Sequence, residues 1–171
     1  MTELQHNCHD YREMHEASEA KPYHYVGSGL GNVYLVGIKY HVCKRCGSAA
    51  ADIPALPELL TALARALVKK QSSLTGEELR FLRKRLKFSG IEFSSMIDIS
   101  AETLSRIENG RYAVQLNTDK LVRFIYASIA RDRFLNLEAI AKWSAELRTI
   151  SGGERIIATR DANDQWIAHA A

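Results

Sequence analysis

Residues 99–112 contain polar side chains whose types and spacing match the chemistry of DNA base edges. Glu102 and Arg106 lie four positions apart, so a helix would place both side chains on one face. An arginine donates two parallel hydrogen bonds to guanine O6 and N7, whereas a carboxylate accepts one from cytosine N4. Arg106 is therefore the strongest candidate for a base contact, and Glu102 would accept from cytosine while repelling phosphate.

A second set of polar and basic side chains would contact phosphate groups. Its members are Ser100, Thr103, Asn109 and Arg111, and Ser105 also faces outward. Plain capping or solvent exposure is the alternative role for each of them. Residues 65–87 add eight basic side chains, Lys84 among them, against two acidic ones. This basic cluster is either a solvated helix face or a flank that faces phosphates, and its place directly before residues 89–109 favours the flank.

Capping signals predict a helix, a tight turn and a second helix within residues 89–109. Ser89 and Glu92 have the spacing of a capping box, and Ser100 is the expected N-cap of the second helix. The apolar face of that second helix comprises Ile99, Leu104 and Ile107. Asn109-Gly110 supplies a left-handed stop after it.

Further helices and strands are predicted on both sides of this segment. Pro57 begins a helix that extends to about Lys70, and a capping box at Thr75 and Glu78 begins the next. Two more helices are expected at 117–130 and 136–148, and strands at 22–26 and 32–36, with a third entering Cys43. The C-terminal residues predict a hairpin with its turn at 161–164. Because two isolated strands are marginal in water, this hairpin should pack on the helices, a second copy or a partner.

The cysteines indicate a metal site near the N-terminus. Cys43 and Cys46 form Cys-x-x-Cys-Gly, which in a reducing compartment is more typical of half a zinc site than of a disulfide. The other half leaves two ligand sets open: Cys43 and Cys46 with Cys8 and one of His6 or His9, or Cys43 and Cys46 with both histidines. One structural zinc ion is the preferred interpretation, and a small sheet that folds without metal is the alternative.

The overall composition is that of a globular protein. The 171 residues are 46% hydrophobic and 25% charged, and a net charge of +3 is too small to imply a partner by itself. No apolar run approaches the roughly 18 residues of a membrane span, and the N-terminus lacks the regions of a signal peptide, so we expect a cytoplasmic protein. Nothing in the spacing singles out a base beside an open metal site, so we expect no enzyme.

Two stretches resemble known families. Thr75 to Tyr112 resembles the Xre/Cro-type helix-turn-helix domains, and the residues in the family's register are Thr103, Ser105, Arg106, Glu108, Asn109 and Gly110. Tyr23 to Gly47 followed by this domain is similar to the MqsA/YgiT-type antitoxins, which join a zinc knuckle to such a domain. Together the two matches cover roughly residues 8–130. Two positions depart from the Xre/Cro pattern: Gly90 stands where Gln is usual, and Asp98 replaces the turn glycine.

The patterns and the resemblance together predict an α+β chain in four parts. These are a zinc-knuckle β domain (1–52), a connecting helix (53–72), a five-helix helix-turn-helix domain (73–150) and a C-terminal hairpin tail (151–171). We expect a homodimer that contacts its second copy through residues 117–130 and through the tail. The side chains expected at this contact are Leu121, Phe124, Ile125, Ile129 and Trp166.

The resemblance implies a sequence-specific repressor that binds a palindromic operator in double-stranded DNA. It also implies the antitoxin of a type II toxin-antitoxin pair, which neutralises a toxin and represses its own operon. In such domains the start of the second helix, here Ala101 and Glu102, points at base edges. The alternative is a protein-interaction module whose helix-turn-helix has lost DNA binding, and Gly90, Glu102 and the modest net charge favour that alternative.

Overall fold

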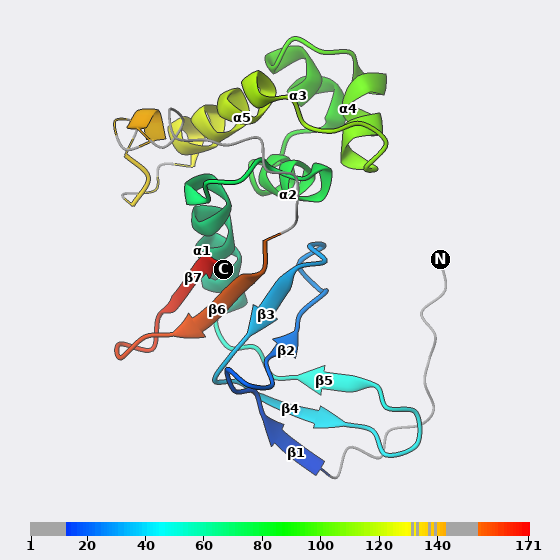
Figure 1. Ribbon diagram of the computed structural model, residues 1–171, viewed down its shortest axis with the longest axis vertical. Helices are drawn as coiled ribbons and strands as arrows, with labels where there is room; N and C mark the ends of the chain where they lie inside the picture. Colours follow the sequence, from blue (N-terminus) through cyan, green and yellow to red (C-terminus); the bar gives the residue numbers. More distant parts are fainter. Residues whose placement is uncertain (1–12, 131, 133, 137, 139, 143–153) are drawn as a thin grey trace.

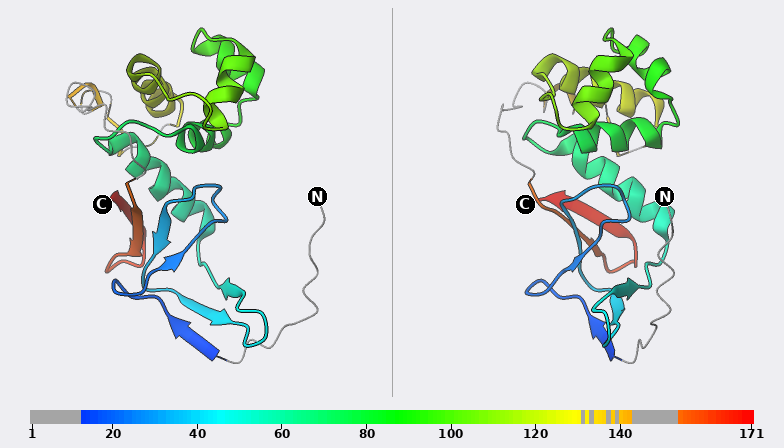
Figure 2. Two further views of the ribbon diagram at one scale, coloured as in Figure 1. Left: turned by 45° about the vertical axis from the view of Figure 1, so that its right-hand side comes forward. Right: turned by 90° about the vertical axis from the view of Figure 1, so that its right-hand side faces the viewer.

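The structure is a computed structural model that describes residues 13–130, 132, 134–136, 138, 140–142 and 154–171 (Figure 1). These residues form two small sheets at one end of the molecule and a group of short helices at the other. Helix α1 (Leu56–Lys69) lies between the two ends in every view (Figure 2). The α+β class predicted from the sequence is confirmed.

The described strands form one three-stranded and one four-stranded sheet. The first sheet has the antiparallel order β1-β4-β5, with β1 at Glu13–Glu16, β4 at Lys39–Val42 and β5 at Ala49–Ala51. The second has the order β2-β3-β6-β7, with β2 at Tyr23–His24, β3 at Val33–Leu35, β6 at Ile156–Arg160 and β7 at Trp166–Ala170. Both predicted hairpins, β2–β3 and β6–β7, are therefore present.

The C-terminal hairpin completes the N-terminal sheet. β6 pairs in parallel with β3, so that Val33 lies opposite Ile156 and Leu35 lies opposite Ala158. All four of these side chains are buried. Residues of the predicted segments 1–52 and 151–171 thus share one sheet and one core, a long-range pairing that the sequence analysis did not predict.

Helix α1 covers this four-stranded sheet and packs mainly against β7. Pro57 lies in its first turn, where the missing N–H costs nothing, and its buried stripe includes Leu59, Leu63 and Leu67. Trp166 of β7 is only 4% exposed, and its indole Nε1 donates to the Pro54 carbonyl at 2.8 Å. The expectation that Trp166 lies at a dimer contact is wrong, because this protomer already buries the side chain.

The helices with defined bounds that follow α1 within the described residues have the order that the sequence predicts. They are α2 (Gly76–Arg85), α3 (Gly90–Met96), α4 (Ala101–Glu108) and α5 (Leu116–Ile129). Their shared core includes Leu79, Leu82, Phe93, Leu104 and Val122. Of the predicted helix 136–148, residues 138 and 140–142 are helical, and 143–148 lie outside the described residues.

Helices α2 and α4 approach each other very closely at Gly76. A Cβ atom at this position would lie 1.9 Å from the Ile107 carbonyl oxygen, far inside van der Waals contact. Only glycine therefore allows the start of α2 to rest against the end of α4.

A buried carboxylate connects the sheet, the linker and α2. Glu78 is 1% exposed and belongs to the predicted capping box, since its Oε2 accepts from the Thr75 N–H at 2.7 Å. The same oxygen accepts from Lys70 Nζ at 2.7 Å, and Oε1 accepts from Asn32 Nδ2 at 3.3 Å. The capping residue Glu78 thus also joins the start of α2 to Asn32 in the β2–β3 turn and to Lys70, the residue after α1.

Arg123 of α5 fixes the end of α1 in a second buried network. Its Nε and Nη2 donate to Asp119, and its Nη1 and Nη2 donate to the carbonyls of Val68, Lys70 and Ser72. Asp119 in turn accepts from the Leu74 N–H at 2.7 Å. All five guanidinium N–H groups thereby have acceptors, which offsets the cost of burying the charge.

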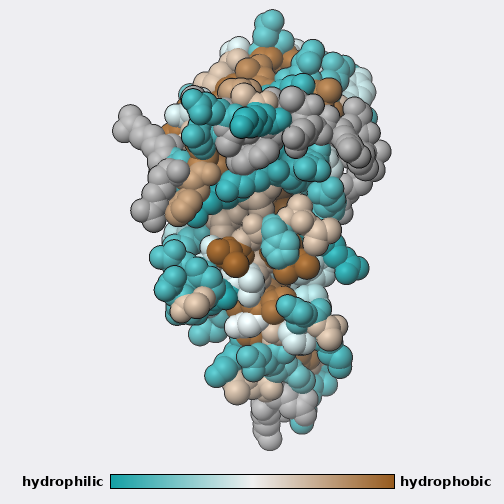
Figure 3. All heavy atoms as spheres, turned by 60° about the vertical axis from the view of Figure 1, so that its left-hand side comes forward, coloured by the Kyte–Doolittle hydropathy of each residue, from teal (hydrophilic) through white to brown (hydrophobic). Residues whose placement is uncertain are grey.

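The surface is mostly polar, with scattered apolar side chains. Figure 3 shows apolar groups at mid-height on one face, at the level of α1 and the C-terminal strands of Figure 1. Exposed apolar side chains in these two elements include Leu56 and Ile167. Within the described part of the chain, no helix is long and apolar enough to cross a membrane.

Candidate nucleic-acid interface

The first helix of the motif, α3, begins with the predicted capping box. Ser89 Oγ accepts from the Glu92 N–H at 3.2 Å, and Glu92 Oε2 accepts from the Ser89 N–H at 2.8 Å. The interaction with the Ser89 hydroxyl, followed by that with the backbone N–H, lowers the pKa of Glu92 below its usual value. The carboxylate therefore stays charged and caps the helix.

The turn between α3 and α4 depends on Asp98. Its φ of 55° lies in the left-handed region, where Asp is tolerated better than a branched residue. The Ile99 N–H then donates to the Ser94 carbonyl at 3.0 Å, which closes the turn. The replacement of the family's glycine by Asp98 therefore preserves the turn.

Helix α4 begins and ends where the sequence predicts. Ser100 Oγ accepts from the Thr103 N–H at 3.0 Å, and Leu104 and Ile107 are buried. At the other end Gly110 has a φ of 71°, and the Arg111 N–H donates to the Arg106 carbonyl at 2.9 Å. A short helix with one buried face and one free face results.

The free face of α4 carries the predicted base-contacting side chains together. Its exposed residues are Ala101, Glu102, Ser105, Arg106 and Asn109. The spacing of these residues puts them along one side of the helix, opposite Leu104 and Ile107. Among the other predicted contacts, Ser100 and Arg111 are exposed, and Thr103 is half-buried with its hydroxyl 2.8 Å from that of Ser100.

Arg106 has two partners within the protein. Its Nη2 lies 2.5 Å from Glu102 Oε1, and its Nη1 donates to the Tyr112 hydroxyl at 2.8 Å. The ion pair is exposed, so it contributes at most about 1 kcal/mol. A bidentate contact with guanine discriminates by about 1–3 kcal/mol, so DNA can outcompete Glu102 for the guanidinium. Sequence analysis missed Tyr112, which reaches Arg106 because the chain turns back at Gly110.

Glu108 holds α4 against α2. It accepts from Arg83 Nε at 2.6 Å and from Arg83 Nη2 at 2.8 Å, and Arg80 Nε lies 3.4 Å away. The hydrogen bond to Glu108 raises the pKa of Arg83, while burial lowers it. Because the two residues are 25 positions apart, no local spacing could have revealed this pair.

Asn109 is a structural residue as well as a candidate phosphate contact. Its Nδ2 donates to the Ser105 carbonyl at 2.8 Å, and its Oδ1 accepts from Arg80 Nη2 at 2.6 Å. Its carboxamide therefore already has a donor and an acceptor within the protein. Ser100 is in a similar position, because its hydroxyl caps α4.

Gly90 and Lys84 lie outside α4. Gly90 is the first residue of α3, and an added Cβ there meets no atom within 4 Å. Lys84 is exposed on α2, where it lines a pocket together with the turn at residues 27–29. The structure thus places Lys84 near the N-terminal hairpin as well as within the basic cluster.

The cysteines of the predicted zinc site lie at the end of β4. Cys43 is buried and Cys46 is exposed. The Gly47 N–H donates to the Cys43 carbonyl at 2.8 Å, and Gly47 has a φ of 70°, a left-handed conformation that glycine adopts without strain. The other predicted ligands, His6, Cys8 and His9, lie outside the described residues. Among the residues that are described, no group of three or more His, Cys, Asp or Glu side chains has the arrangement of a metal site.

Comparison with known proteins supports the helix-turn-helix assignment. Residues 79–118 match the model of the family described as Helix-turn-helix (HTH_3), and this range contains α3, the turn at Asp98 and α4. The geometry and the match together indicate a DNA-binding transcription regulator. No curated protein and no solved structure gave a significant match.

Proposed function

We propose that this protein is a sequence-specific transcriptional repressor that binds its operator through α4. The observation that supports this most strongly is the exposed face of α4, with Arg106 at its centre and the buried Glu108 fixing the helix on α2. A rigidly held helix of this size fits the major groove, and its bound form would exclude RNA polymerase from an overlapping promoter.

The repressor acts as a homodimer on a palindromic site. Leu121 and Ile129 on α5 are 40% and 42% exposed, and a second copy that packs on α5 would cover both side chains. A two-fold axis places the two α4 helices about 34–36 Å apart, one turn of DNA. Palindromic half-sites separated by this distance are the expected target.

DNA selection followed by salt titration tests the proposal. Purified protein is incubated with random duplexes, bound sequences are enriched and read, and the affinity for the enriched site is measured between about 50 and 200 mM salt. A palindromic consensus and a steep loss of affinity with salt are expected, because contacts with about six phosphates release counterions. Enrichment without a consensus, or an affinity independent of salt, would refute the repressor.

The repressor is also the antitoxin of a type II toxin-antitoxin pair. Support comes from the order of the elements: a Cys-x-x-Cys-Gly turn in a small sheet, followed by a helix-turn-helix, as in the MqsA/YgiT-type antitoxins. In the test, the neighbouring gene is expressed alone and together with the gene for this protein. Growth arrest by the neighbour alone and its relief by co-expression are expected, and the absence of arrest would refute this part while leaving the repressor intact.

The N-terminal sheet holds one structural zinc ion. Cys43 and Cys46 supply two thiolates, and the two remaining ligands are Cys8 with one of His6 or His9, or both histidines. Zinc bound there would fix the ends of the small sheet, whose own apolar area is limited.

Elemental analysis should give about one zinc per chain. Cys43→Ser should abolish binding, and His6→Ala and His9→Ala separate the two ligand sets. Full-length protein without zinc would refute the site.

A protein-interaction module without DNA binding is the second candidate. Two observations favour it: α3 begins with Gly90, which has no side chain to brace a phosphate, and Glu102 both repels phosphate and occupies Arg106. The salt titration separates the two candidates, because only DNA binding predicts the steep salt dependence.

A further inference from the structure

A pocket between α2 and the β2–β3 hairpin lies outside the proposed DNA contacts of α4. It has a volume of about 300 Å³ and is lined by three segments far apart in the sequence. These are the turn at residues 27–29, Leu60 of α1, and α2 together with Lys87, two positions beyond its end. This volume is at the lower end of the range for small-molecule sites.

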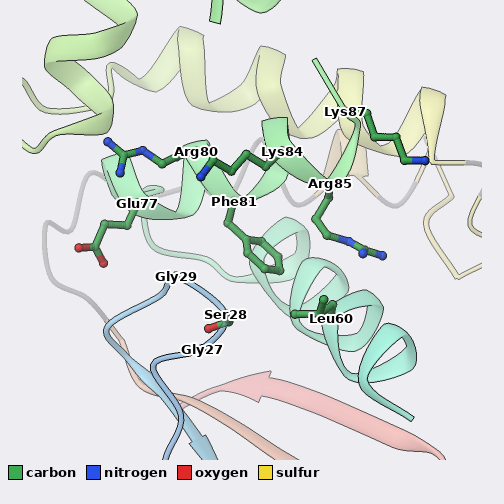
Figure 4. A pocket seen from close by; sticks show the side chains of 10 residues that line it. All are labelled: Gly27, Ser28, Gly29, Leu60, Glu77, Arg80, Phe81, Lys84, Arg85 and Lys87. Atoms are coloured by element: carbon green, nitrogen blue, oxygen red, sulfur yellow. The ribbon is translucent and has the colours of Figure 1, made fainter. Parts of the chain in front are cut away.

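The walls of this pocket are chemically divided. Phe81 points from α2 toward the turn, with Leu60 beside it, and these two side chains form an apolar floor (Figure 4). Four basic side chains line the rest: Arg80, Lys84, Arg85 and Lys87. The single acid is Glu77 at one end. Its Oε2 already accepts from the Gly31 N–H at 3.2 Å.

Several of these positive groups lack partners. Within the described part of the chain, neither the Lys84 nor the Lys87 ammonium group makes an ion pair, and both residues are exposed. Arg85 Nη2 donates to Thr61, but its buried Nε has no acceptor among the described residues. The exposed Lys84 and Lys87 ammonium groups are therefore the positive charges that an anion in the pocket would reach first.

The hairpin turn is held at a fixed distance from these charges. The Gly31–Glu77 hydrogen bond and the Asn32–Glu78 hydrogen bond join the end of the turn to the first residues of α2. Gly29 has a φ of 79°, and nothing lies within 4 Å of the position of an added Cβ, so its backbone faces open space. The pocket is therefore a preformed feature of the fold and needs no partner to create it.

We propose that this pocket binds a small organic anion that has a phosphate or carboxylate at one end and an apolar, planar body at the other. The anionic group lies at Lys84 and the neighbouring basic side chains, and the apolar body lies over Phe81 and Leu60. The formation of this site needs only α1, α2 and the β2–β3 hairpin, and Lys84 is shared with the candidate phosphate contacts to DNA.

The test uses 1-naphthyl phosphate as the probe and needs no DNA. Amide shifts of the full chain are followed by NMR during titration with this probe, with inorganic phosphate, and with 1-naphthol. Saturable shifts at Gly27, Ser28, Gly29 and Phe81 are expected with 1-naphthyl phosphate. Each half of the probe alone should bind about tenfold more weakly, because it uses one kind of wall only.

Two variants test whether the anionic group of the probe binds at Lys84. Lys84→Ala should weaken binding of 1-naphthyl phosphate by about tenfold, as expected for the loss of one charge-assisted contact. Lys39→Ala, which removes an exposed lysine from β4 in the other sheet, should leave it unchanged. Both substitutions are at exposed positions, so the variants should fold like the parent chain.

Three results would overturn the proposal. Equal affinity for 1-naphthyl phosphate and inorganic phosphate would show a general basic surface without an apolar floor. Equal losses in Lys84→Ala and Lys39→Ala would show that net charge alone attracts the probe. Shifts at Gly27, Ser28 and Gly29 with duplex DNA but not with 1-naphthyl phosphate would assign these charges to the DNA backbone.

Discussion

Two arginine–acid pairs with the same helical spacing have different roles in this molecule. Glu102–Arg106 in α4 and Asp119–Arg123 in α5 are both i,i+4 pairs with a distance of 2.5 Å between their closest atoms. The side chains of the first pair are 74% and 44% exposed, and those of the second 0% and 2%. Exposure leaves Arg106 free to change partners, whereas burial commits Arg123 to five acceptors that fix the end of α1.

The i,i+4 spacing brings the two side chains of each pair together, whereas burial or exposure sets the free energy of their interaction. In water the charges are screened, and an i,i+4 pair contributes a few tenths of a kcal/mol, about 0.3–0.5. In the interior the pair cannot be removed from one side without leaving an unpaired charge. The weak exposed pair in α4 leaves Arg106 available to bind DNA, whereas the buried pair in α5 holds α5 and the end of α1 together.

Removing Arg123 should have the largest effect. Arg123→Ala leaves the Asp119 carboxylate and the carbonyls of Val68, Lys70 and Ser72 without their donor, so the free energy of unfolding should fall by about 3–5 kcal/mol. Urea denaturation measures this loss. Arg106→Ala is the matched control at the exposed pair and should lose less than about 1 kcal/mol. Similar losses in both variants would contradict the comparison.

Removing Arg106 should instead affect DNA recognition. Arg106→Ala should cost about 1–3 kcal/mol of binding at the selected operator, with little effect on random duplexes, because a bidentate contact with guanine is lost. Competition binding with both kinds of DNA measures the two losses. Arg111 is an exposed candidate contact to a phosphate, so Arg111→Ala should weaken binding to the operator and to random duplexes alike. An equal loss on both DNAs for Arg106→Ala would show that it does not contact a base.

Adding a side chain at Gly90 should strengthen DNA binding. Gly90→Gln supplies the amide that related domains carry at the start of α3, and there is open space for it. One new hydrogen bond, less the cost of ordering the Gln side chain, contributes about 0.5–1.5 kcal/mol, so the operator affinity should rise about two- to tenfold. Gly90→Ala controls for the change in backbone freedom. A Gln variant that binds no better than the Ala variant would show that α3 does not face the phosphate backbone.

Neutralising Glu102 should have the smallest effect. Glu102→Gln releases Arg106 from its exposed partner and removes a charge that repels phosphate, so the affinity should rise about two- to fivefold at low salt. The gain should shrink in high salt, because the repulsion is screened. The free energy of unfolding should change by less than about 1 kcal/mol. A weaker complex at low salt would indicate that Glu102 accepts a hydrogen bond from cytosine.

Much of the helical half could be predicted because its signals are local. The capping boxes at Thr75–Glu78 and Ser89–Glu92, the N-cap Ser100 and the stop at Gly110 all act within a few residues and are all present. Such hydrogen bonds form whenever the chain becomes helical there, so sequence spacing is sufficient to find them. The exposed face of α4 follows from the same spacing.

The long-range features could not be predicted in this way. The parallel pairing of β3 with β6 joins residues more than a hundred positions apart, and the buried Trp166 bonds to Pro54 across a similar distance. The Asn32–Glu78 and Arg83–Glu108 contacts likewise depend on which elements become neighbours. No local propensity encodes these partners, because they result from packing of the whole chain.

Local sequence signals are sufficient to place the ends of the helices, and they give Glu102 and Arg106 the same helical spacing as Asp119 and Arg123. The packing of the whole chain leaves the first pair in water, buries the second, and adds the C-terminal hairpin to the N-terminal sheet. The physical reason is that hydrogen-bond geometry within a helix is local, whereas burial is a property of the neighbours that the fold provides.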